Sequence, residues 1–151
     1  MGDLAREQKC AHRRRSRAQL ERERGAQASW LRGMRWAYVA TGTFARPMTA
    51  WGILEVVRKW LDSLEGAYAA IGLQYGPVAA KLHVHALIGG VRRVPLTETF
   101  LRRSWVKGGH VQLDGYHPAR GFVEYLVTQA DAIELIGSPR PYRTRRRGGR
   151  R

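Results

Sequence analysis

The stretch Lys81-Leu82-His83-Val84-His85-Ala86-Leu87-Ile88-Gly89-Gly90 decides the fold of this chain, because it alternates as a β-strand does. Successive side chains of a strand point to opposite faces. One face is therefore wholly apolar and consists of Leu82, Val84, Ala86 and Ile88. The other face carries His83 and His85, which lie roughly 6.5 to 7 Å apart along a strand. Two imidazoles at this separation can converge on one metal ion, although a histidine pair also occurs on ordinary strand surfaces.

Two segments downstream of the histidines complete a resemblance to a known family. The segment Trp105-Val106-Lys107-Gly108-Gly109-His110-Val111-Gln112-Leu113 is followed by Pro118-Ala119-Arg120-Gly121-Phe122-Val123-Glu124-Tyr125-Leu126-Val127-Thr128. With the histidine stretch, these segments resemble the HUH endonucleases, in particular the rolling-circle replication initiators of bacteria and phages, in which they lead to a nucleophilic tyrosine. The motifs stand in the family's order, about forty residues apart, and the resemblance covers residues 35–137.

The resemblance implies an α+β fold of the ferredoxin-like or RRM-like kind. A central antiparallel sheet of about five strands would have helices packed on one side. Side-chain alternation indicates strands over residues 35–44, 67–75 and 110–116 as well as at the histidine stretch. We expect residues 67–75 to pair with the histidine strand as an antiparallel neighbour.

Helices are expected between these strands. Thr49 is a suitable N-cap for a helix that runs to about Glu65 and ends at Gly66. A basic turn and a short helix should occupy residues 91–104. His117-Pro118 should begin the helix that carries the family's tyrosine, because proline is well tolerated in a first helical turn.

A chain of 151 residues that is 44% hydrophobic fits one domain with a real core. We divide it into a basic N-terminal arm (residues 1–34), an HUH endonuclease domain (35–137) and a disordered arginine-rich tail (138–151). A lone cysteine, Cys10, excludes an internal disulfide and a cysteine-built zinc site. No run approaches the 18 or so apolar residues of a membrane span. We therefore expect a cytoplasmic protein of a bacterial or archaeal host cell, with no membrane partner.

The net charge of +15 is concentrated at the two ends of the chain. Residues 1–35 hold ten Lys and Arg against four acids, residues 36–137 hold ten against eight, and residues 138–151 hold seven Arg and no acid. A nearly neutral body with two basic arms fits a polyanionic partner such as single-stranded DNA, bound with a strong dependence on salt. The alternative is that these charges serve only solubility or nonspecific adhesion to RNA.

The metal site that the resemblance implies departs from the family's pattern at one ligand. His83 and His85 would bind Mg or Mn. In the related initiators a glutamate on the preceding strand completes the site and is commonly followed one residue later by glycine. Gln74-Tyr75-Gly76 stands at that position. An amide oxygen can bind a hard divalent ion but adds no charge, so we expect weaker metal affinity. Otherwise, Gln74 is a plain polar residue at a strand end.

Tyr125 matches the position of the family's nucleophile. A phenol is a poor nucleophile at neutral pH, so the reaction needs an electrophilic phosphate and a stabilised phenolate, and a bound divalent ion provides both. The related initiators usually carry lysine three residues after the tyrosine, where this chain has Thr128. Lys81 lies on the histidine face of its strand, and we expect it to supply the missing charge. The alternative role for Tyr125 is ordinary packing of a helix on the sheet.

The activity implied by the resemblance is nicking and joining of single-stranded DNA. The enzyme would recognise a specific sequence or hairpin and pass through a 5′-phosphotyrosine intermediate, as in the initiation of rolling-circle replication. Single-tyrosine HUH transposases are an alternative, because in them a glutamine four residues after the tyrosine binds the metal; here it would be Gln129 in place of Gln74. A catalytically inactive, HUH-derived module that binds nucleic acid is another alternative.

Aromatic and basic residues outside the catalytic set are expected to contact the DNA. Bases would stack on Trp36 and Tyr38. Phosphates would be contacted by five basic residues: Arg92, Arg93, Arg102, Arg103 and Lys107. Such residues are also common on any solvated surface. The chain has no P-loop sequence, so unwinding would require a partner such as a host helicase. Both a monomer and a dimer are compatible with the sequence.

Overall fold

The computed structural model describes residues 16–75, 82–130 and 132–141. Five antiparallel strands form one sheet in the order β4-β1-β3-β2-β5. The strands are β1 (Tyr38–Thr43), β2 (Tyr68–Tyr75), β3 (Leu82–Gly89), β4 (His110–Gly115) and β5 (Ile133–Ile136). The helices are α2 (Arg17–Arg32), α3 (Ala50–Asp62), α4 (Pro95–Arg103) and α5 (Phe122–Gln129), with a short 3-10 turn, η1, at Pro118–Arg120. This arrangement confirms the predicted α+β fold with a five-stranded antiparallel sheet.

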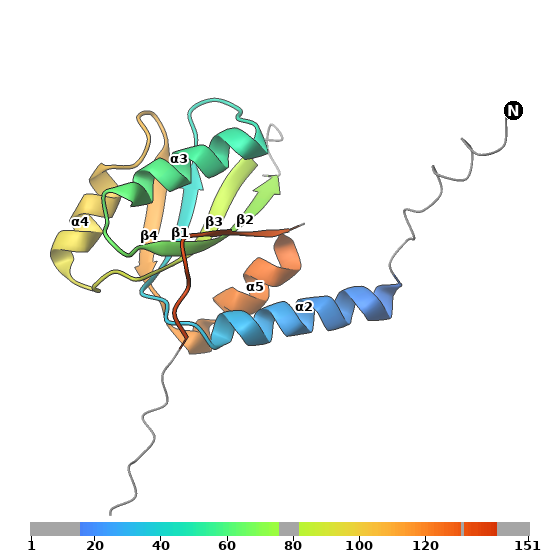
Figure 1. The fold of residues 1–151 in the computed structure, drawn as a ribbon. Coiled ribbons are helices and arrows are strands. Elements are labelled where there is room, and N and C mark those ends of the chain that lie inside the picture. The colour runs from blue at the N-terminus through green and yellow to red at the C-terminus, as the bar shows by residue number, and fades with distance from the viewer. Residues whose placement is uncertain (1–15, 76–81, 131, 142–151) are drawn as a thin grey trace, which may run out of the picture.

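Helices cover both faces of the sheet, whereas the prediction had them on one side. Figure 1 shows α3 and α4 on one face and α5 with α2 on the other. The α3 face buries Ile71, Val84 and Ile88 in one apolar cluster. The opposite face buries Ala70 and Leu87 in a second cluster, so it also needs a cover. Because both faces are apolar over part of their length, strand β3 is buried from its third position onward.

The helix α3 begins where its cap was predicted. The Thr49 side chain accepts a hydrogen bond from the Gly52 backbone N–H at 3.1 Å, which satisfies one free donor of the first turn. One stripe of this helix packs on the sheet and consists of Ile53, Val57, Trp60 and Leu61, all buried. The chain turns after the helix at Gly66, whose φ of 76° is in the left-handed region that favours glycine.

The start of α5 differs from the prediction. Pro118 begins the single 3-10 turn η1, and not the α-helix itself. Gly121, with φ of 68°, follows in the left-handed conformation, and α5 begins at Phe122. The glycine changes the chain direction between the two helices. The α-helix therefore has only eight residues, from Phe122 to Gln129.

The expected N-terminal arm is partly a folded element. Helix α2 is capped by the Ser16 side chain, which accepts from the Gln19 N–H at 3.2 Å. Its last turns bury Ala28 and Leu31 against the α5 side of the sheet. Its first turns are exposed and extend away from the body in Figure 1. The apolar cover on this face therefore comes in part from a segment that the sequence assigned to a basic arm.

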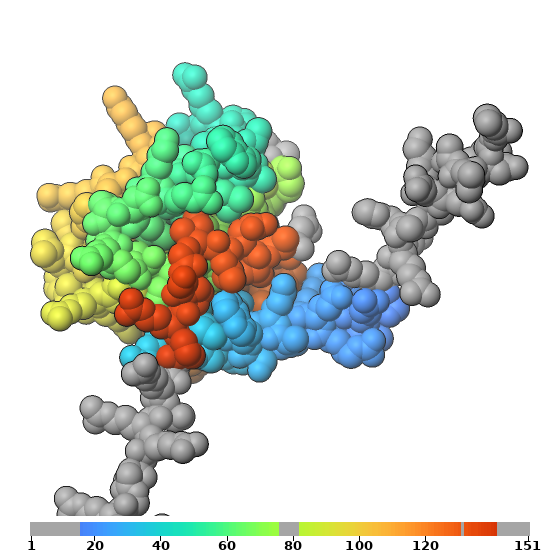
Figure 2. Space-filling model, in the orientation of Figure 1, coloured from blue at the N-terminus to red at the C-terminus, as the bar shows by residue number. Residues whose placement is uncertain are grey.

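The segment after α5 returns to the body of the fold. The prediction counted about five strands but gave residue ranges for four. The remaining strand is β5, which pairs with β2 and forms one edge of the sheet. The chain then follows α2: the Arg35 N–H donates to the Arg140 carbonyl at 3.0 Å, and Met34 forms a β-bridge with Pro141. In Figure 2 this red segment lies between the green α3 region and the blue helix α2. The first residues of the predicted tail are therefore part of the fold, and residues 142–151 lie outside the described ranges.

Candidate active site

The two histidines of β3 lie at the centre of the sheet, on the face that carries α5. Strand β3 has β1 on one side and β2 on the other. His85 is directly opposite Thr41 on β1, and His83 is directly opposite Gln74 on β2. The two imidazole rings are 4.9 Å apart between centroids and nearly perpendicular. His83 is half-buried, and His85 is 7% exposed.

Gln74, His85 and Tyr125 form one hydrogen-bonded cluster. The Tyr125 hydroxyl donates to Gln74 Oε1 at 3.0 Å, and its oxygen is 3.5 Å from His85 Nε2. His85 Nε2 is in turn 3.0 Å from Gln74 Oε1. The Tyr125 and His85 rings are 5.1 Å apart in an edge-to-face arrangement. Three residues that the sequence singled out separately are therefore in direct contact.

Helix α5 can approach the sheet closely because residue 72 is glycine. Gly72 is the β2 partner of His85. A Cβ atom at this position would be 2.7 Å from both Ala130 Cβ and Leu126 Cδ1, which is closer than packed carbon atoms approach. Leu126 is fully buried against the sheet. Tyr125, its neighbour on the helix, is 40% exposed, so its hydroxyl lies at the boundary between the site and solvent.

Burial, together with a smaller contribution from repulsion by His83, lowers the pKa of His85 from its ordinary value of 6.5 to about 4. The imidazole is therefore neutral at neutral pH. Its Nδ1 atom is 3.2 Å from the Thr41 hydroxyl. In the tautomer that matches the cluster, His85 Nε2–H donates to Gln74 Oε1 and the Thr41 hydroxyl donates to Nδ1. Thr41 was not identified from the sequence, although its place opposite His85 follows from the strand pairing.

The donor atoms of the cluster fit a divalent ion with neutral ligands. No group of three or more His, Cys, Asp or Glu gathers within residues 16–75, 82–130 and 132–141. Gln74 Oε1 and His85 Nε2 are 3.0 Å apart. Two ligands at about 2.1 Å from an octahedral ion, at right angles to each other, are separated by about 3.0 Å. The neutral imidazole and the amide oxygen are thus spaced as neighbouring ligands of one ion.

Gln129 belongs to the same cluster. The Gln74 Nε2 amide group donates to Gln129 Oε1 at 3.2 Å. Gln129 is on the last turn of α5, one turn after Tyr125. Both glutamines that the sequence offered as alternative metal ligands are therefore at the site, and Gln74 is the one in contact with His85.

A pocket of about 240 Å³ adjoins the cluster on the side of β4. Thr41 and Phe122 form the wall nearest the cluster. The Phe122 ring is 6.3 Å from the His85 ring and 6.1 Å from the Tyr125 ring, between centroids. The remaining polar lining comes from Gln112, Asp114, His117 and Arg120. Sequence reasoning did not identify this pocket, because its residues come from β1, β4, η1 and α5.

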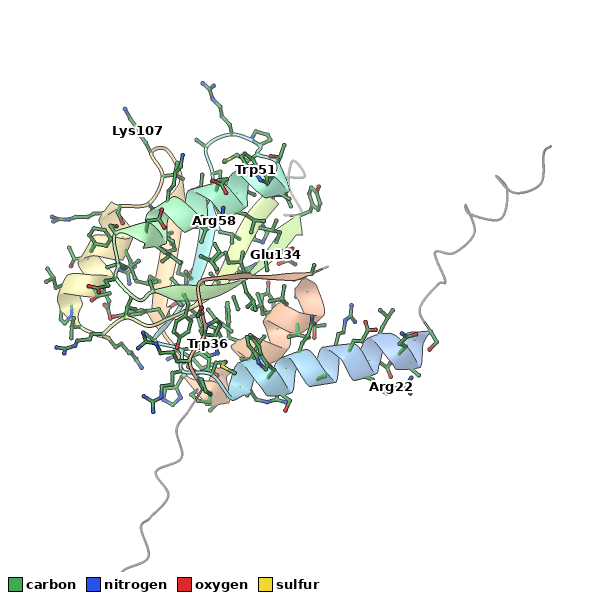
Figure 3. All side chains as sticks on the ribbon, viewed as in Figure 1. Arg22, Trp36, Trp51, Arg58, Lys107 and Glu134 are labelled. Carbon is green, nitrogen blue, oxygen red and sulfur yellow. The ribbon has the colours of Figure 1, made fainter. Side chains whose placement is uncertain are left out.

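The prediction that DNA bases stack on Trp36 and Tyr38 is wrong for this conformation. Trp36 is 7% exposed, packs edge-to-face on Tyr68 and donates its indole N–H to the Leu31 carbonyl at 2.7 Å. Tyr38 is fully buried, and its hydroxyl is near the carbonyls of the loop before α4. Both rings serve the core because helices cover both faces of β1. Figure 3 shows Trp36 beside α2.

The predicted phosphate-contacting cations are exposed: Arg92, Arg93, Arg102, Arg103 and Lys107. Two of them support the backbone, since Arg93 donates to the Tyr116 carbonyl at 3.2 Å and Arg102 donates to the Leu113 carbonyl at 2.6 Å. Lys107 is on the loop between α4 and β4 (Figure 3). Lys81, predicted to replace the missing lysine, lies outside the described residues.

Comparison of the chain with protein-family models and with curated proteins finds no match. Among solved structures, it is similar to the hypothetical protein ORF119 from Sulfolobus islandicus rod-shaped virus 1. The TM-score is 0.47 at 9% sequence identity, and the match covers 71% of this chain and 93% of the viral protein. Within the part of the chain that the structure describes, no helix has the length and apolar character needed to cross a membrane.

Proposed function

We propose that this protein is a metal-dependent endonuclease of the HUH type that nicks and rejoins single-stranded DNA. One observation carries the proposal: the Tyr125 hydroxyl is 3.0 Å from Gln74 Oε1 and 3.5 Å from His85 Nε2. A nucleophile and two metal-ligand atoms thus meet at one point, although they come from three separate elements. Tyr125 is also 40% exposed, so part of its side chain is open to a ligand.

The metal would be Mg or Mn, held by His83, His85 and Gln74, with Gln129 as the alternative ligand. Of the two ions, Mn is favoured by a site with imidazole ligands, because Mg prefers oxygen. When bound, such an ion polarises a phosphoryl oxygen and stabilises the charge that develops during displacement. The pKa of about 4 keeps the His85 ring neutral. Metal binding at Nε2 would use the other tautomer, in which Nδ1–H donates to the Thr41 hydroxyl oxygen and Nε2 carries the lone pair.

The residues of the chain would orient the attack. Gln74 Oε1 accepts the phenolic hydrogen bond and so fixes the position of the Tyr125 oxygen. Thr41 holds His85 through Nδ1, which leaves Nε2 directed at the site. These hydrogen bonds do not bring a cation to the position that the scissile phosphate would occupy. Lys81 remains the residue proposed for that role.

The proposed reaction forms one bond to phosphorus and breaks another. The Tyr125 oxygen attacks the scissile phosphorus and loses its proton to water. The bond between phosphorus and the 3′ oxygen breaks, and that oxygen takes up a proton. The products are a free 3′ hydroxyl and DNA joined through its 5′ phosphate to Tyr125. Attack by another 3′ hydroxyl on this ester reverses the chemistry and rejoins DNA, as rolling-circle replication requires.

The transposase alternative is favoured by one contact. Gln129 Oε1 is 3.2 Å from Gln74 Nε2, so an oxygen of Gln129 lies within hydrogen-bonding distance of the other candidate ligand. The inactive-module alternative is favoured by another feature, since Gln74 closes a neutral network with His85 and Tyr125 that is satisfied without metal. Single-stranded DNA is the proposed partner in all three cases.

The experiment is covalent capture of DNA. The full chain is incubated with Mn and a pool of labelled single-stranded oligonucleotides, and adducts are separated on a denaturing gel and located by mass spectrometry. We expect an adduct at Tyr125 that is absent in Tyr125→Phe and retained in Tyr75→Phe, a matched change at another exposed tyrosine. Tight DNA binding without an adduct would favour the inactive module.

A second pair of variants separates the initiator from the transposase. Gln74→Ala should abolish adduct formation if Gln74 is the ligand, whereas Gln129→Ala should then have a smaller effect. The opposite order would favour the transposase. Because the two side chains are hydrogen-bonded to each other, the Mn concentration at half-maximal rate is the more direct measurement. It should rise for the variant that removes a ligand.

A further inference from the structure

The pocket beside the reactive cluster combines an aromatic wall with polar side chains. Its volume of about 240 Å³ is below the range of about 300–1,000 Å³ that is typical for drug-sized ligands. An aromatic ring, Phe122, forms one wall, and a cation, Arg120, is on the η1 side. Stacking on a ring and contact with a phosphate are the two means by which proteins hold single-stranded nucleic acid.

The pocket is continuous with the proposed reaction centre. Thr41 belongs to both, because it lines the pocket and contacts His85 Nδ1 at 3.2 Å. Phe122 also belongs to both, with its ring centroid 6.1 Å from that of Tyr125. A nucleotide whose phosphate is at Tyr125 would therefore have its base, or that of its neighbour, at the mouth of this pocket.

We propose that this pocket reads the base next to the scissile phosphate, and that Asp114 determines which base is accepted. The inference rests on the proposed binding of single-stranded DNA. An exposed carboxylate on a surface that must attract phosphates opposes binding through repulsion. A role in contacting a base edge accounts for its presence inside the pocket.

The orientation of Gln112 defines the chemistry of the base edge. Its Nε2 amide donates to Asp114 Oδ2 at 3.2 Å. The amide oxygen of Gln112 and the second carboxylate oxygen of Asp114 are therefore acceptors for a ligand. Adenine, cytosine and guanine each offer an amino group with two hydrogens to such a pair of acceptors, whereas the single N–H on the pairing edge of thymine lies between two carbonyl oxygens that would face the acceptors. The pocket should accept an amino-bearing base and reject thymine.

The test is selection of bound sequences from a random single-stranded DNA library. The full chain is used with the Tyr125→Phe change, so that covalent capture does not distort the binding equilibrium. We expect one position of the enriched sequence to be depleted of thymine by about tenfold. In the Asp114→Asn variant, one acceptor becomes a donor, and the depletion at that position should fall to about twofold or less.

Asp62→Asn is the matched control, because Asp62 is an exposed acid at the end of α3, on the opposite face of the sheet. Its sequence preferences should equal those of the parent at every position. A Phe122→Leu variant provides a second readout: loss of stacking should weaken binding of every library member while the base preference at the position persists. Unchanged thymine depletion in Asp114→Asn would overturn the inference, as would a library with no base preference at any position.

Failure of this inference is distinguishable from failure of the proposed function. An oligonucleotide with the enriched sequence is incubated with Mn and the chain that retains Tyr125. Adduct formation supports nicking whatever the Asp114 result is. Absence of an adduct, together with a base preference that depends on Asp114, would leave a sequence-reading DNA-binding module and refute the nicking proposal alone.

Discussion

Replacing Gln74 by glutamate should convert the neutral cluster into a charged one. The change is isosteric, so the new carboxylate would retain the position of Gln74 Oε1, 3.0 Å from His85 Nε2. A negative charge at this distance stabilises the protonated imidazole and opposes the burial that lowers the pKa of His85 to about 4. The same charge should strengthen divalent-metal binding, because a carboxylate contributes a negative charge that an amide lacks.

The size of the pKa change follows from the 3.0 Å separation. Coulomb's law gives about 1.4 kcal/mol at the dielectric constant of water and about 5.5 kcal/mol at an effective value of about 20. At about 1.36 kcal/mol per unit, these limits correspond to a rise of about one to four units. Because the Gln74 side chain is only half-buried, the lower half of this range applies. We therefore expect the pKa of His85 to rise by about one to two units.

The assay is an NMR titration of the histidine ring signals in metal-free protein, with wild type and Gln74→Glu compared. Gln129→Glu is the matched control, since Gln129 contacts Gln74 Nε2 and is one residue farther from the imidazole in the network. Its effect on His85 should be the smaller of the two. A His85 pKa that does not change in Gln74→Glu, or that changes equally in both variants, would refute the proximity argument. Mn titration of the same samples should show tighter binding for Gln74→Glu.

Three further outcomes follow from the packing of the site. Thr41→Val removes the partner of His85 Nδ1, which should lower Mn affinity about 10- to 100-fold, measured by calorimetry, and stability by about 1 kcal/mol. Gly72→Ala places a Cβ on β2 where Leu126 of α5 and Ala130 pack. It should lower the free energy of unfolding in urea by about 1–3 kcal/mol. The folded-state pKa of His85, about 4, is below the ordinary 6.5, so unfolded chains take up a proton that folded chains exclude. Stability should therefore fall as pH drops from about 6.5 to about 4, and His85→Gln should flatten this slope in pH-dependent urea melts.

The fold was predictable where the sequence has a regular alternation of side chains or a recognisable helix cap. The alternation of residues 67–75 and the histidine stretch predicted β2, β3 and their pairing, and the Thr49 cap predicted the start of α3. Strand β5 has four residues, none of them fully buried, so it lacks an alternating pattern that could be recognised. The start of α5 was misjudged because Pro118 is equally suited to a 3-10 turn, and the left-handed Gly121 could not be inferred from its identity alone.

The centre of the candidate site was predictable because strand geometry fixes it. The two-residue period puts His83 and His85 on one face, and antiparallel pairing brings Gln74 beside them. The surroundings were not predictable, because they depend on which helices cover that face. The α2 and α5 cover turned Trp36 into a core residue, where the sequence suggested an exposed DNA-binding ring. Long-range packing, and not residue type, decided this.

The two departures from the initiator pattern balance each other in charge. Relative to the initiator pattern, glutamine in place of glutamate removes a negative charge beside the proposed metal site, and Thr128 in place of lysine removes a positive charge from the exposed side of the tyrosine helix. With a divalent ion at the proposed site, residues 74 and 128 together would contribute the same net charge in both arrangements, before any contribution from Lys81. It follows that Gln74→Glu alone should bind metal more tightly yet attack phosphate more slowly, since the phosphate then faces one positive charge less. Adding Thr128→Lys should restore the rate, so the two changes should be non-additive in single-turnover cleavage. Strictly additive rates would show that the two positions do not act on the same phosphate.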